Sequence, residues 1–329
     1  MGNVHTNAEE LFSVRNLRVE YTSGGEAIHA VNGVSFELAA GSTIGLVGET
    51  GAGKTSIARA ILRILPDHAT RMVDGEVWFK GQELLKLPED KMRHLRGKSI
   101  SMIFQDPMTA LNPVKTVVEQ IAEGLRLHQH MNKHDSIKEA VKMLELVGIS
   151  GDRAYEYPHQ FSGGMKQRVV IAIALACKPE LLIADEPTTA LDVTIQAQVL
   201  DLMKDLQKQM NTSMILITHD LGVVAGVCDS VAVVYAGELV EYGSKEDLFD
   251  HPMHPYTLGL FGALPDLSKD VKRLSPVEGL PPDPSNLPEG CSFAPRCPHA
   301  TDACRKGQIS MTEVSKKHFV RCIRCSKEA

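Results

Sequence analysis

Short apolar runs separated by glycine-rich turns mark the first hundred residues. Residues 11–21 and 27–38 combine β-branched and aromatic side chains and flank the turn TSGGE, which predicts an antiparallel pair of strands. The run STIGLVG predicts a short buried strand that leads into a glycine loop. The segment KTSIARAILRIL follows this loop, and its apolar spacing predicts a helix. DGEVWFKGQEL and KSISMIFQD are two more strand-rich segments. This part of the chain is therefore expected to be mixed α/β.

Apolar residues at helical spacing dominate the middle of the chain. VVEQIAEGLRLH, IKEAVKMLELVG and GMKQRVVIAIALAC each predict a helix. ELLIADE and SMILITHD are apolar without alternation, as in parallel strands covered on both faces. The helical stretch VTIQAQVLDLMKDLQKQM between them predicts a βαβ crossover, and SVAVVYAGELVEYG predicts a hairpin.

The character of the sequence changes after about residue 250. HPMHPYTLGLFGALP predicts a short helix bounded by prolines, and SPVEGLPPDPSNLPEG predicts an extended or irregular segment. We expect an α/β domain over residues 1–250, with a helical subdomain at about 106–175. A C-terminal extension over residues 251–329 follows it.

Composition and charge narrow the class of protein. The net charge is −6 and the pI about 6.1, which disfavours a dedicated nucleic-acid binder. The N-terminus has no apolar signal-peptide core, and the most apolar run, VVIAIALAC, is about half the length that spans a membrane. We expect a soluble or peripheral cytoplasmic protein. In that compartment, clustered cysteines indicate metal or redox chemistry rather than disulfides.

The segment GETGAGKT has the pattern of a phosphate-binding loop between a strand and a helix. Its glycines let backbone N–H groups face a phosphate chain, and the helix N-terminus favours anions. Lys54 is expected to reach the terminal phosphates and Thr55 to bind Mg²⁺. The alternative is a chance glycine turn. The expected nucleotide-binding residues are Gly48, Glu49, Thr50, Gly51, Ala52, Gly53, Lys54, Thr55 and Ser56.

Polar side chains at the ends of predicted strands suggest the rest of a catalytic site. Asp185 is placed to hold Mg²⁺, and Glu186 to polarise an attacking water; the alternative is an acidic turn. Gln105 and His219 end two other strands, at the edge where open α/β sheets bind ligands. Each is otherwise an ordinary surface residue. Tyr21 is placed either to stack on a base or to pack in the core.

The segment FSGGMKQR resembles the signature motif of ATP-binding cassette (ABC) ATPases. The resemblance covers roughly residues 11–250 and departs at Phe161, where leucine is commoner. It implies a RecA-like P-loop core with an antiparallel β subdomain and a helical subdomain, bearing the C-terminal extension. It also implies ATP hydrolysis with Mg²⁺. In sequence order the implied residues are Tyr21 for adenine, Gly48–Thr55 for phosphates, Gln105, the signature Ser162, Gly163 and Gly164, Asp185, Glu186, the D-loop Ala190–Asp192 and His219.

The same resemblance assigns roles and partners. Glu186, Gln105 and His219 are implied in catalysis, whereas Thr55, Gln105 and Asp185 are implied around Mg²⁺. Family members pair two cassettes head to tail, so that Ser-Gly-Gly of one closes over the γ-phosphate held by the other. This chain has one cassette, which implies a second ATPase subunit, identical or homologous.

The C-terminal extension resembles that of ATP-binding subunits of dipeptide, oligopeptide and nickel importers. This implies peptide import at the cytoplasmic face of the membrane, with two permease subunits and an extracellular or periplasmic substrate-binding protein. The segment after Gln105 and the helical block to about residue 151 are implied to dock a permease helix. The rival classes are DNA-repair, ribosome-associated and iron–sulfur-assembly ATPases, and importers of nickel or sugars.

Five of the seven cysteines fall in the last forty residues or so. By position, Cys291, Cys297, Cys304 and Cys322 match the tail cysteines of the peptide importers, which implies a [4Fe–4S] cluster held by four thiolates. Cys325 is an alternative to Cys322. Zinc and free thiols are the rival readings of the tail. Cys177 and Cys228 lie in apolar surroundings and are expected to be core residues.

Overall fold

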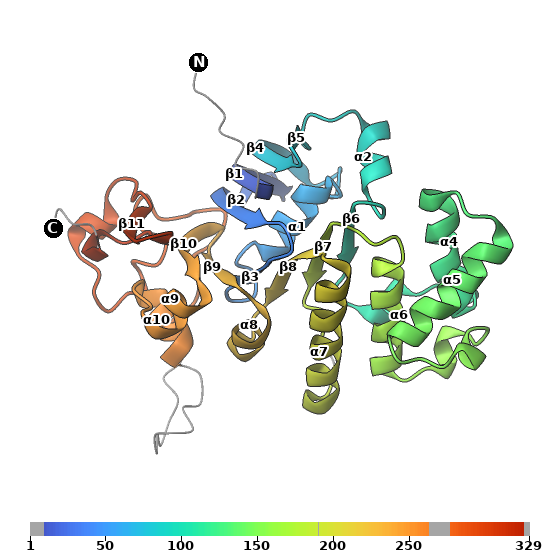
Figure 1. The fold of residues 1–329 in the computed structure, drawn as a ribbon. Helices are drawn as coiled ribbons and strands as arrows, with labels where there is room; N and C mark the ends of the chain where they lie inside the picture. Colours follow the sequence, from blue (N-terminus) through green and yellow to red (C-terminus); the bar gives the residue numbers. More distant parts are fainter. Residues whose placement is uncertain (1–9, 190, 263–276, 326–329) are drawn as a thin grey trace. The chain divides into compact units, whose positions relative to one another are not determined.

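The computed structural model describes residues 10–189, 191–262 and 277–325 (Figure 1). By its internal contacts the chain forms two compact units. The first contains Met1–Leu38, Ile44–Leu85 and Thr218–Ala329, and the second contains Ala39–Thr43 and Lys86–Ile217. Ala190 and residues 263–265, which belong to two of the sequence predictions, lie outside the described residues.

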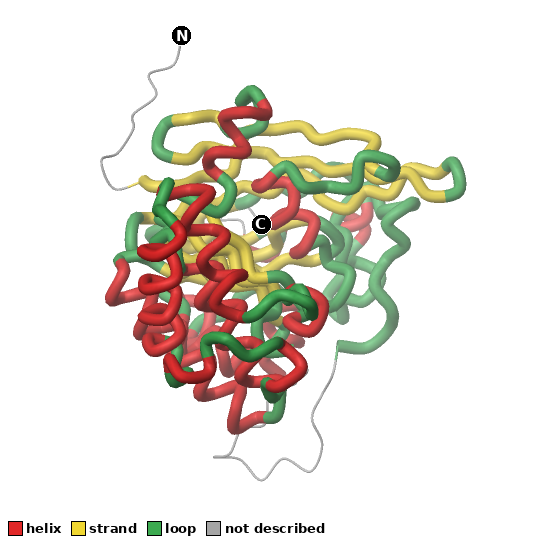
Figure 2. The backbone as a smooth tube through the Cα atoms, turned by 90° about the vertical axis from the view of Figure 1, so that its right-hand side faces the viewer, coloured by secondary structure: helices red, strands yellow, loops and turns green. Residues whose placement is uncertain are grey.

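An antiparallel sheet forms one part of the first unit. Its strands are β1 (Glu10–Ser23), β2 (Glu26–Ala39), β4 (Thr70–Phe79) and β5 (Gln82–Glu83), in the order β2-β1-β4-β5. They appear as the long yellow bands at the top of Figure 2. Gly24 and Gly25 join β1 to β2 with φ of 60° and 88°, which glycine adopts without strain. The far half of β2 alternates buried and exposed residues, so Val34, Phe36 and Leu38 face the core.

The second sheet of this unit carries the C-terminal extension. β3 (Thr43–Val47) runs parallel to β9 (Ser230–Tyr235), and β9 pairs antiparallel with β10 (Glu238–Ser244). β12 (His318–Val320) then pairs antiparallel with β10, and β11 (Thr312–Ser315) with β12. The helices of the unit are α1 (Lys54–Leu62), α8 (Leu221–Val227), α9 (Lys245–Asp250) and α10 (Pro255–Gly262). The predicted β9–β10 hairpin is confirmed, whereas β11 and β12 were not foreseen.

The second unit has a parallel sheet of β6 (Ile100–Ile103), β7 (Leu181–Asp185) and β8 (Ser213–Thr218), with β7 between the other two. The helix α7 (Val193–Met210) connects β7 to β8, which is the predicted βαβ crossover. All five residues of β7 and all six of β8 are buried, which explains why neither strand alternates in sequence.

A helical block completes the second unit: α2 (Glu89–Leu95), α3 (Pro107–Ala110), α4 (Val117–Gln129), α5 (Lys133–Leu146) and α6 (Gly163–Leu175). The helices α4, α5 and α6 pack against one another (Figure 1). One face of α4 is fully buried because its apolar residues recur every three to four positions. Short 3-10 turns occur at Gly151–Arg153, Pro158–Gln160, Asp302–Arg305 and Ile323–Cys325.

Candidate nucleotide-binding site

The loop between β3 and α1 has a shape that only glycine permits at two points. A Cβ atom on Gly48 would lie 2.1 Å from the carbonyl oxygen of Val234, and one on Gly53 would lie 2.3 Å from that of Ala30. Gly53 also has a φ of 99°, which other residues rarely adopt. The helix α1 begins at the next residue, Lys54. The predicted strand, glycine loop and helix are therefore all present.

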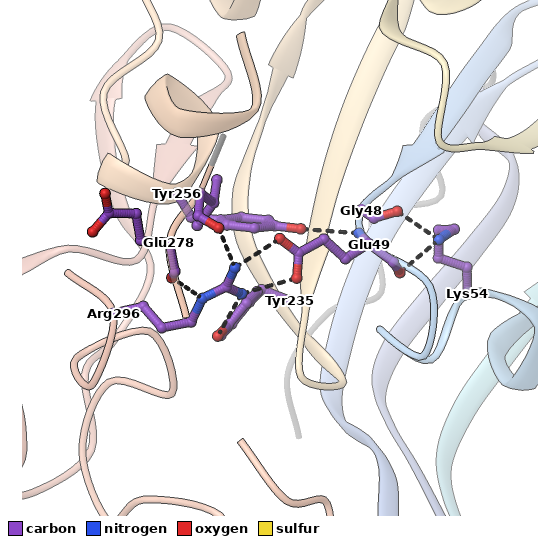
Figure 3. A network of polar contacts seen from close by, with 8 residues as sticks. Gly48, Glu49, Lys54, Tyr235, Tyr256, Glu278 and Arg296 are labelled. Carbon is purple, nitrogen blue, oxygen red and sulfur yellow. Dashed lines mark hydrogen bonds and ion pairs between the residues drawn. The ribbon is translucent and has the colours of Figure 1, made fainter. Parts of the chain in front are cut away.

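Lys54 is folded over its own loop. Its side chain is buried, and Nζ donates hydrogen bonds to the carbonyl oxygens of Gly48 at 2.6 Å and Glu49 at 2.9 Å (Figure 3). The ammonium group thus lies at the N-terminal end of α1, where the helix dipole also favours an anion. The ammonium group and the positive end of the helix dipole both favour a phosphate chain at this position.

Tyr21 of β1 lies next to the start of α1. Its hydroxyl donates to Ser56 Oγ at 3.0 Å, and its ring is half-buried. Two residues predicted for the nucleotide site thus come together from segments 35 positions apart.

The second residue of the loop, Glu49, is held by residues that the sequence did not single out. Its backbone N–H donates to the Tyr256 hydroxyl at 2.9 Å. Its carboxylate forms an ion pair with Arg296, with Nη1–Oε2 and Nη2–Oε1 distances of 2.9 and 3.1 Å (Figure 3). Tyr256 and Arg296 both belong to the C-terminal extension.

In the second unit, the structure brings Gln105 and Glu186 together. Asp185 ends β7 and is buried, and Glu186 follows it with a left-handed φ of 46°. The carboxylate of Glu186 accepts from Gln105 Nε2 at 3.0 Å and from Thr189 Oγ1 at 2.9 Å. A carboxylate aimed in this way can orient and polarise a water.

The Ser-Gly-Gly motif forms the start of α6. Ser162 is its N-cap residue, and Ser162 and Gly163 are exposed, so the backbone donors at the helix N-terminus face outward. Phe161 is buried, and the guanidinium carbon of Arg153 lies 4.6 Å from its ring centroid. The apolar anchor expected at this position is present.

Two further residues that the sequence predicts for the site, Asp192 and His219, lie at the starts of the helices α7 and α8. Asp192 caps α7 by accepting a hydrogen bond from the Ile195 N–H at 3.0 Å. His219 follows β8, is exposed, and precedes Asp220, which caps α8.

The four predicted tail cysteines line one cavity of about 10 Å³. Cys325 does not line it, and its thiol lies 4.0 Å from the Met253 carbonyl oxygen. Burial raises the pKa of Cys291 to about 11 and also raises the pKa of Cys297. Within residues 10–189, 191–262 and 277–325, no three His, Cys, Asp or Glu side chains are placed so as to hold a metal ion.

Several further residues shape this cavity. His254 lines it and stays neutral, because burial lowers its pKa to about 4, and its Nδ1 accepts from the Tyr256 N–H at 3.1 Å. Phe293, also in the lining, is buried. Of the two cysteines predicted to be core residues, Cys228 is buried and Cys177 only half-buried.

None of the helices in the described part of the chain is long and apolar enough to cross a membrane.

The glycine loop, the buried lysine and the adjacent helix define a P-loop nucleotide-binding protein. Comparison with known families places the chain more closely. Residues 31–189 match the family model described as "ABC transporter", and residues 240–304 match "Oligopeptide/dipeptide transporter, C-terminal region". The chain belongs to the ATP-binding subunits of the ABC transporter family.

Curated relatives match almost the whole chain. It is 51% identical to the dipeptide transport ATP-binding protein DppD of Bacillus subtilis, over 95% of this chain and 94% of that protein. It is 49% identical to the oligopeptide transport ATP-binding protein OppD of Escherichia coli, over 90% of this chain and 88% of that protein. The resemblance drawn from the motifs is thereby confirmed.

A solved structure supports the fold. The ATP-binding cassette MJ0796, in a dimeric post-hydrolysis state bound to ADP and phosphate, superposes with a TM-score of 0.64 at 26% identity. The match covers 71% of this chain and 98% of that one. The predicted ABC ATPase fold is confirmed.

Proposed function

We propose that this chain binds and hydrolyses ATP to power the uptake of dipeptides or oligopeptides through a membrane transporter. The observation that carries the proposal is the combined match of the cassette at residues 31–189 and of the peptide-transporter C-terminal region at 240–304. ATP and Mg²⁺ are the expected cofactors of the cassette.

The predicted site residues have different roles in ATP binding and hydrolysis. Lys54 and the N–H groups of residues 48–56 would bind the phosphates, while Thr55, Gln105 and Asp185 would hold the Mg²⁺. Glu186 would polarise the attacking water, Gln105 and His219 would assist catalysis, and Tyr21 would stack on the adenine. The hydrogen bond from Gln105 to Glu186 supports this division for the catalytic carboxylate.

The partners follow from the same proposal. The partner is a second ATPase subunit that is homologous rather than identical. Its Ser-Gly-Gly motif contacts the nucleotide held by this chain, and Ser162–Gly164 of this chain contact the nucleotide held by the partner. Two permease subunits and a substrate-binding protein complete a complex at the cytoplasmic face of the membrane. Native mass spectrometry of the purified complex decides between one and two kinds of ATPase subunit.

The second unit carries exposed apolar side chains in and beside the segment proposed to dock a permease. They are Phe104, Val114, Leu127 and Tyr155, with exposed fractions from 44% to 80%. Phe104 and Val114 flank the segment that begins after Gln105, and Leu127 lies on α4. Apolar side chains this exposed gain from burial against a partner.

The transport proposal is tested with the full complex in lipid vesicles. Peptide-loaded binding protein is expected to stimulate ATP hydrolysis and ATP-dependent uptake of labelled peptide, and Lys54→Ala is expected to abolish both. Uptake of nickel or a sugar but no peptide would make those the cargo. Recovery of the chain with DNA or ribosomes, and never with permeases, would contradict the proposal.

We further propose that the tail holds a [4Fe–4S] cluster through Cys291, Cys297, Cys304 and Cys322. Four cysteines around one cavity suit this group because iron–sulfur clusters are bound by thiolates. A cavity of about 10 Å³ holds roughly one water. A cluster therefore requires the lining segments to move apart. Such a cluster would cross-link the tail, since ATP hydrolysis needs no redox step.

Anaerobic purification tests this proposal. The expected product is a brown protein with about four irons and four acid-labile sulfides per chain, since that is the composition of the cluster. Cys322→Ser is expected to lose the iron, whereas Cys325→Ser is its matched control and is expected to keep it. Stoichiometric zinc without iron, or full iron loading in a Cys291/Cys297/Cys304 triple serine variant, would contradict the cluster.

A further inference from the structure

The C-terminal extension binds the second residue of the phosphate loop, Glu49, through two of its side chains. Glu49 is held by its backbone N–H through Tyr256 and by its carboxylate through Arg296 (Figure 3). The partners are 207 and 247 positions away in the chain. Both lie in the same compact unit as the loop.

The guanidinium of Arg296 is fixed in direction. Its Nε donates to the Glu278 carbonyl oxygen at 2.8 Å, and Nη2 donates to that of Val277 at 3.0 Å. Nη1 also donates to the Tyr235 hydroxyl at 3.3 Å. With the two bonds to Glu49, each nitrogen of the fork has a partner, and the side chain is only 5% exposed. A planar fork held in this way fixes the position of the carboxylate it binds.

The held residue also contacts the lysine of the loop. The carbonyl oxygen of Glu49 accepts from Lys54 Nζ at 2.9 Å. Any shift of Glu49 therefore alters the position of both the loop backbone and the ammonium group that faces the phosphates.

The same extension residues border the cysteine cavity. Phe293 lines the cavity, and its ring centroid lies 5.3 Å from that of Tyr235, 5.4 Å from that of Tyr256 and 5.9 Å from the Arg296 guanidinium carbon. Arg296 directly precedes Cys297, and Tyr256 directly follows Pro255, two further lining positions. A change in the cavity wall consequently moves the residues that hold Glu49.

We propose that Arg296 and Tyr256 are positioning residues for nucleotide binding, and that ligation of the cavity cysteines sets nucleotide affinity through them. The effect of cysteine ligation rests on the proposed tail site, whereas the positioning role of Arg296 and Tyr256 needs only the P-loop. The signal runs from Cys297 and Phe293 through Arg296 to Glu49 and Lys54.

The first arm of the test measures the affinity of the full chain for a fluorescent ATP analogue. Arg296→Gln and Glu49→Gln are each expected to weaken binding by roughly 5- to 150-fold, the usual range for coupled sites. The double variant is expected to be no weaker than either single one, because both remove the same contact. Tyr256→Phe, which removes only a hydroxyl, is expected to act in the same direction. In the transporter, Arg296→Gln is expected to raise KM for ATP while largely sparing kcat.

Arg321→Gln is the matched control. Arg321 directly precedes Cys322 and forms an ion pair with Glu238, so it resembles Arg296 in burial and in closeness to a cavity cysteine. Its ion-pair partner lies on β10 rather than in the phosphate loop. It is expected to leave nucleotide affinity unchanged. An equal loss in Arg321→Gln would overturn the inference, because general loosening of the extension would then explain the effect.

The second arm changes the cavity. The double variant Cys291→Ser/Cys297→Ser is expected to weaken nucleotide binding in a chain that retains Arg296. Its iron content is measured in the same preparation. The same pair is expected to add little in the Arg296→Gln background. Full additivity would overturn the coupling. Unchanged affinity in both Arg296→Gln and Glu49→Gln would overturn the positioning role, whereas a wild-type chain that fails to bind ATP would instead refute the proposed function.

Discussion

At the scale of single residues, Glu186 joins an unusual backbone to an aimed side chain. A left-handed φ of 46° is costly for glutamate, and such conformations persist where the surrounding structure requires them. We predict that Glu186→Gln lowers ATP turnover in the assembled complex by about 10²–10⁴. Binding of ATP is retained, because glutamine still offers an oxygen to Gln105 and Thr189. Steady-state hydrolysis and nucleotide titration measure the two effects.

Asp201→Asn on the exposed side of α7 is a suitable control, since it also removes one carboxylate. It is expected to hydrolyse ATP at the wild-type rate. Near wild-type turnover in Glu186→Gln would show that another group activates the water.

Cys228 provides a pH-dependent prediction. Burial raises the pKa of its thiol to about 12, and alkylating reagents attack the thiolate. The thiol is also buried, so at pH 8 the folded chain is expected to label at Cys228 far more slowly than the unfolded chain, and this labelling should rise with pH. Mass spectrometry of iodoacetamide-treated protein checks this, with urea-unfolded chain as the control.

How much a sequence predicts depends on how local the cause is. The phosphate loop was predictable because its glycines, lysine and flanking elements are contiguous. Gln105 and Glu186 were predictable because carboxyl ends of parallel strands share one sheet edge. Arg296 was not, since its partner Glu49 is 247 positions away and nothing in either local sequence marks the pair.

At the scale of elements, α4 begins with a capping box. Thr116 Oγ1 donates to Glu119 Oε2 at 2.8 Å, and the Thr116 N–H donates to the same oxygen at 3.2 Å. We predict that Thr116→Ala destabilises the first turn by about 1 kcal/mol. Amide exchange in this turn is then expected to quicken about fivefold, as measured by hydrogen–deuterium exchange of the intact chain. Thr116→Ser keeps the hydroxyl and is expected to exchange as the wild type does.

Periodicity explains which elements were predictable. The helices α4, α5 and α7 each repeat the apolar pattern along their length, so their spacing is distinctive, whereas α6 ends in a continuous buried apolar run. The strands β11 and β12 have four and three residues, too few for a pattern. They form because β10 offers an edge on which Phe319 and Val320 pair with Tyr242 and Glu241.

At the scale of the whole molecule, the signature motif is expected to act on a partner chain. A Cβ atom at Gly163 would meet nothing nearer than Leu191 Cδ2 at 3.8 Å, whereas one at Gly164 would lie 2.5 Å from Ile195 Cγ2. Gly163→Asp therefore adds a charge without overpacking. We predict that it leaves ATP binding intact but prevents the ATP-loaded pair from closing, because its carboxylate would face the partner's γ-phosphate.

Light scattering of the co-purified ATPase subunits, in a Glu186→Gln background with ATP, measures this closure. Gly163→Ala adds a methyl group without charge and is expected to close normally. Closure of the Gly163→Asp pair at wild-type ATP concentrations would mean that the motif does not face a phosphate.

The pairing of β12 with β10 also dictates an order of events during protein synthesis. The hairpin of β9 and β10 is local and can form once residue 244 has left the ribosome, whereas β12 must close a loop of more than seventy residues. Cys322 follows β12 by two positions and is therefore positioned only when that strand joins the sheet. A ribosome that stalls before residue 318 would release a chain whose phosphate loop is complete but whose cysteine cavity is open. The cavity is therefore completed late in synthesis, and the proposed cluster would be loaded only after translation of the cassette.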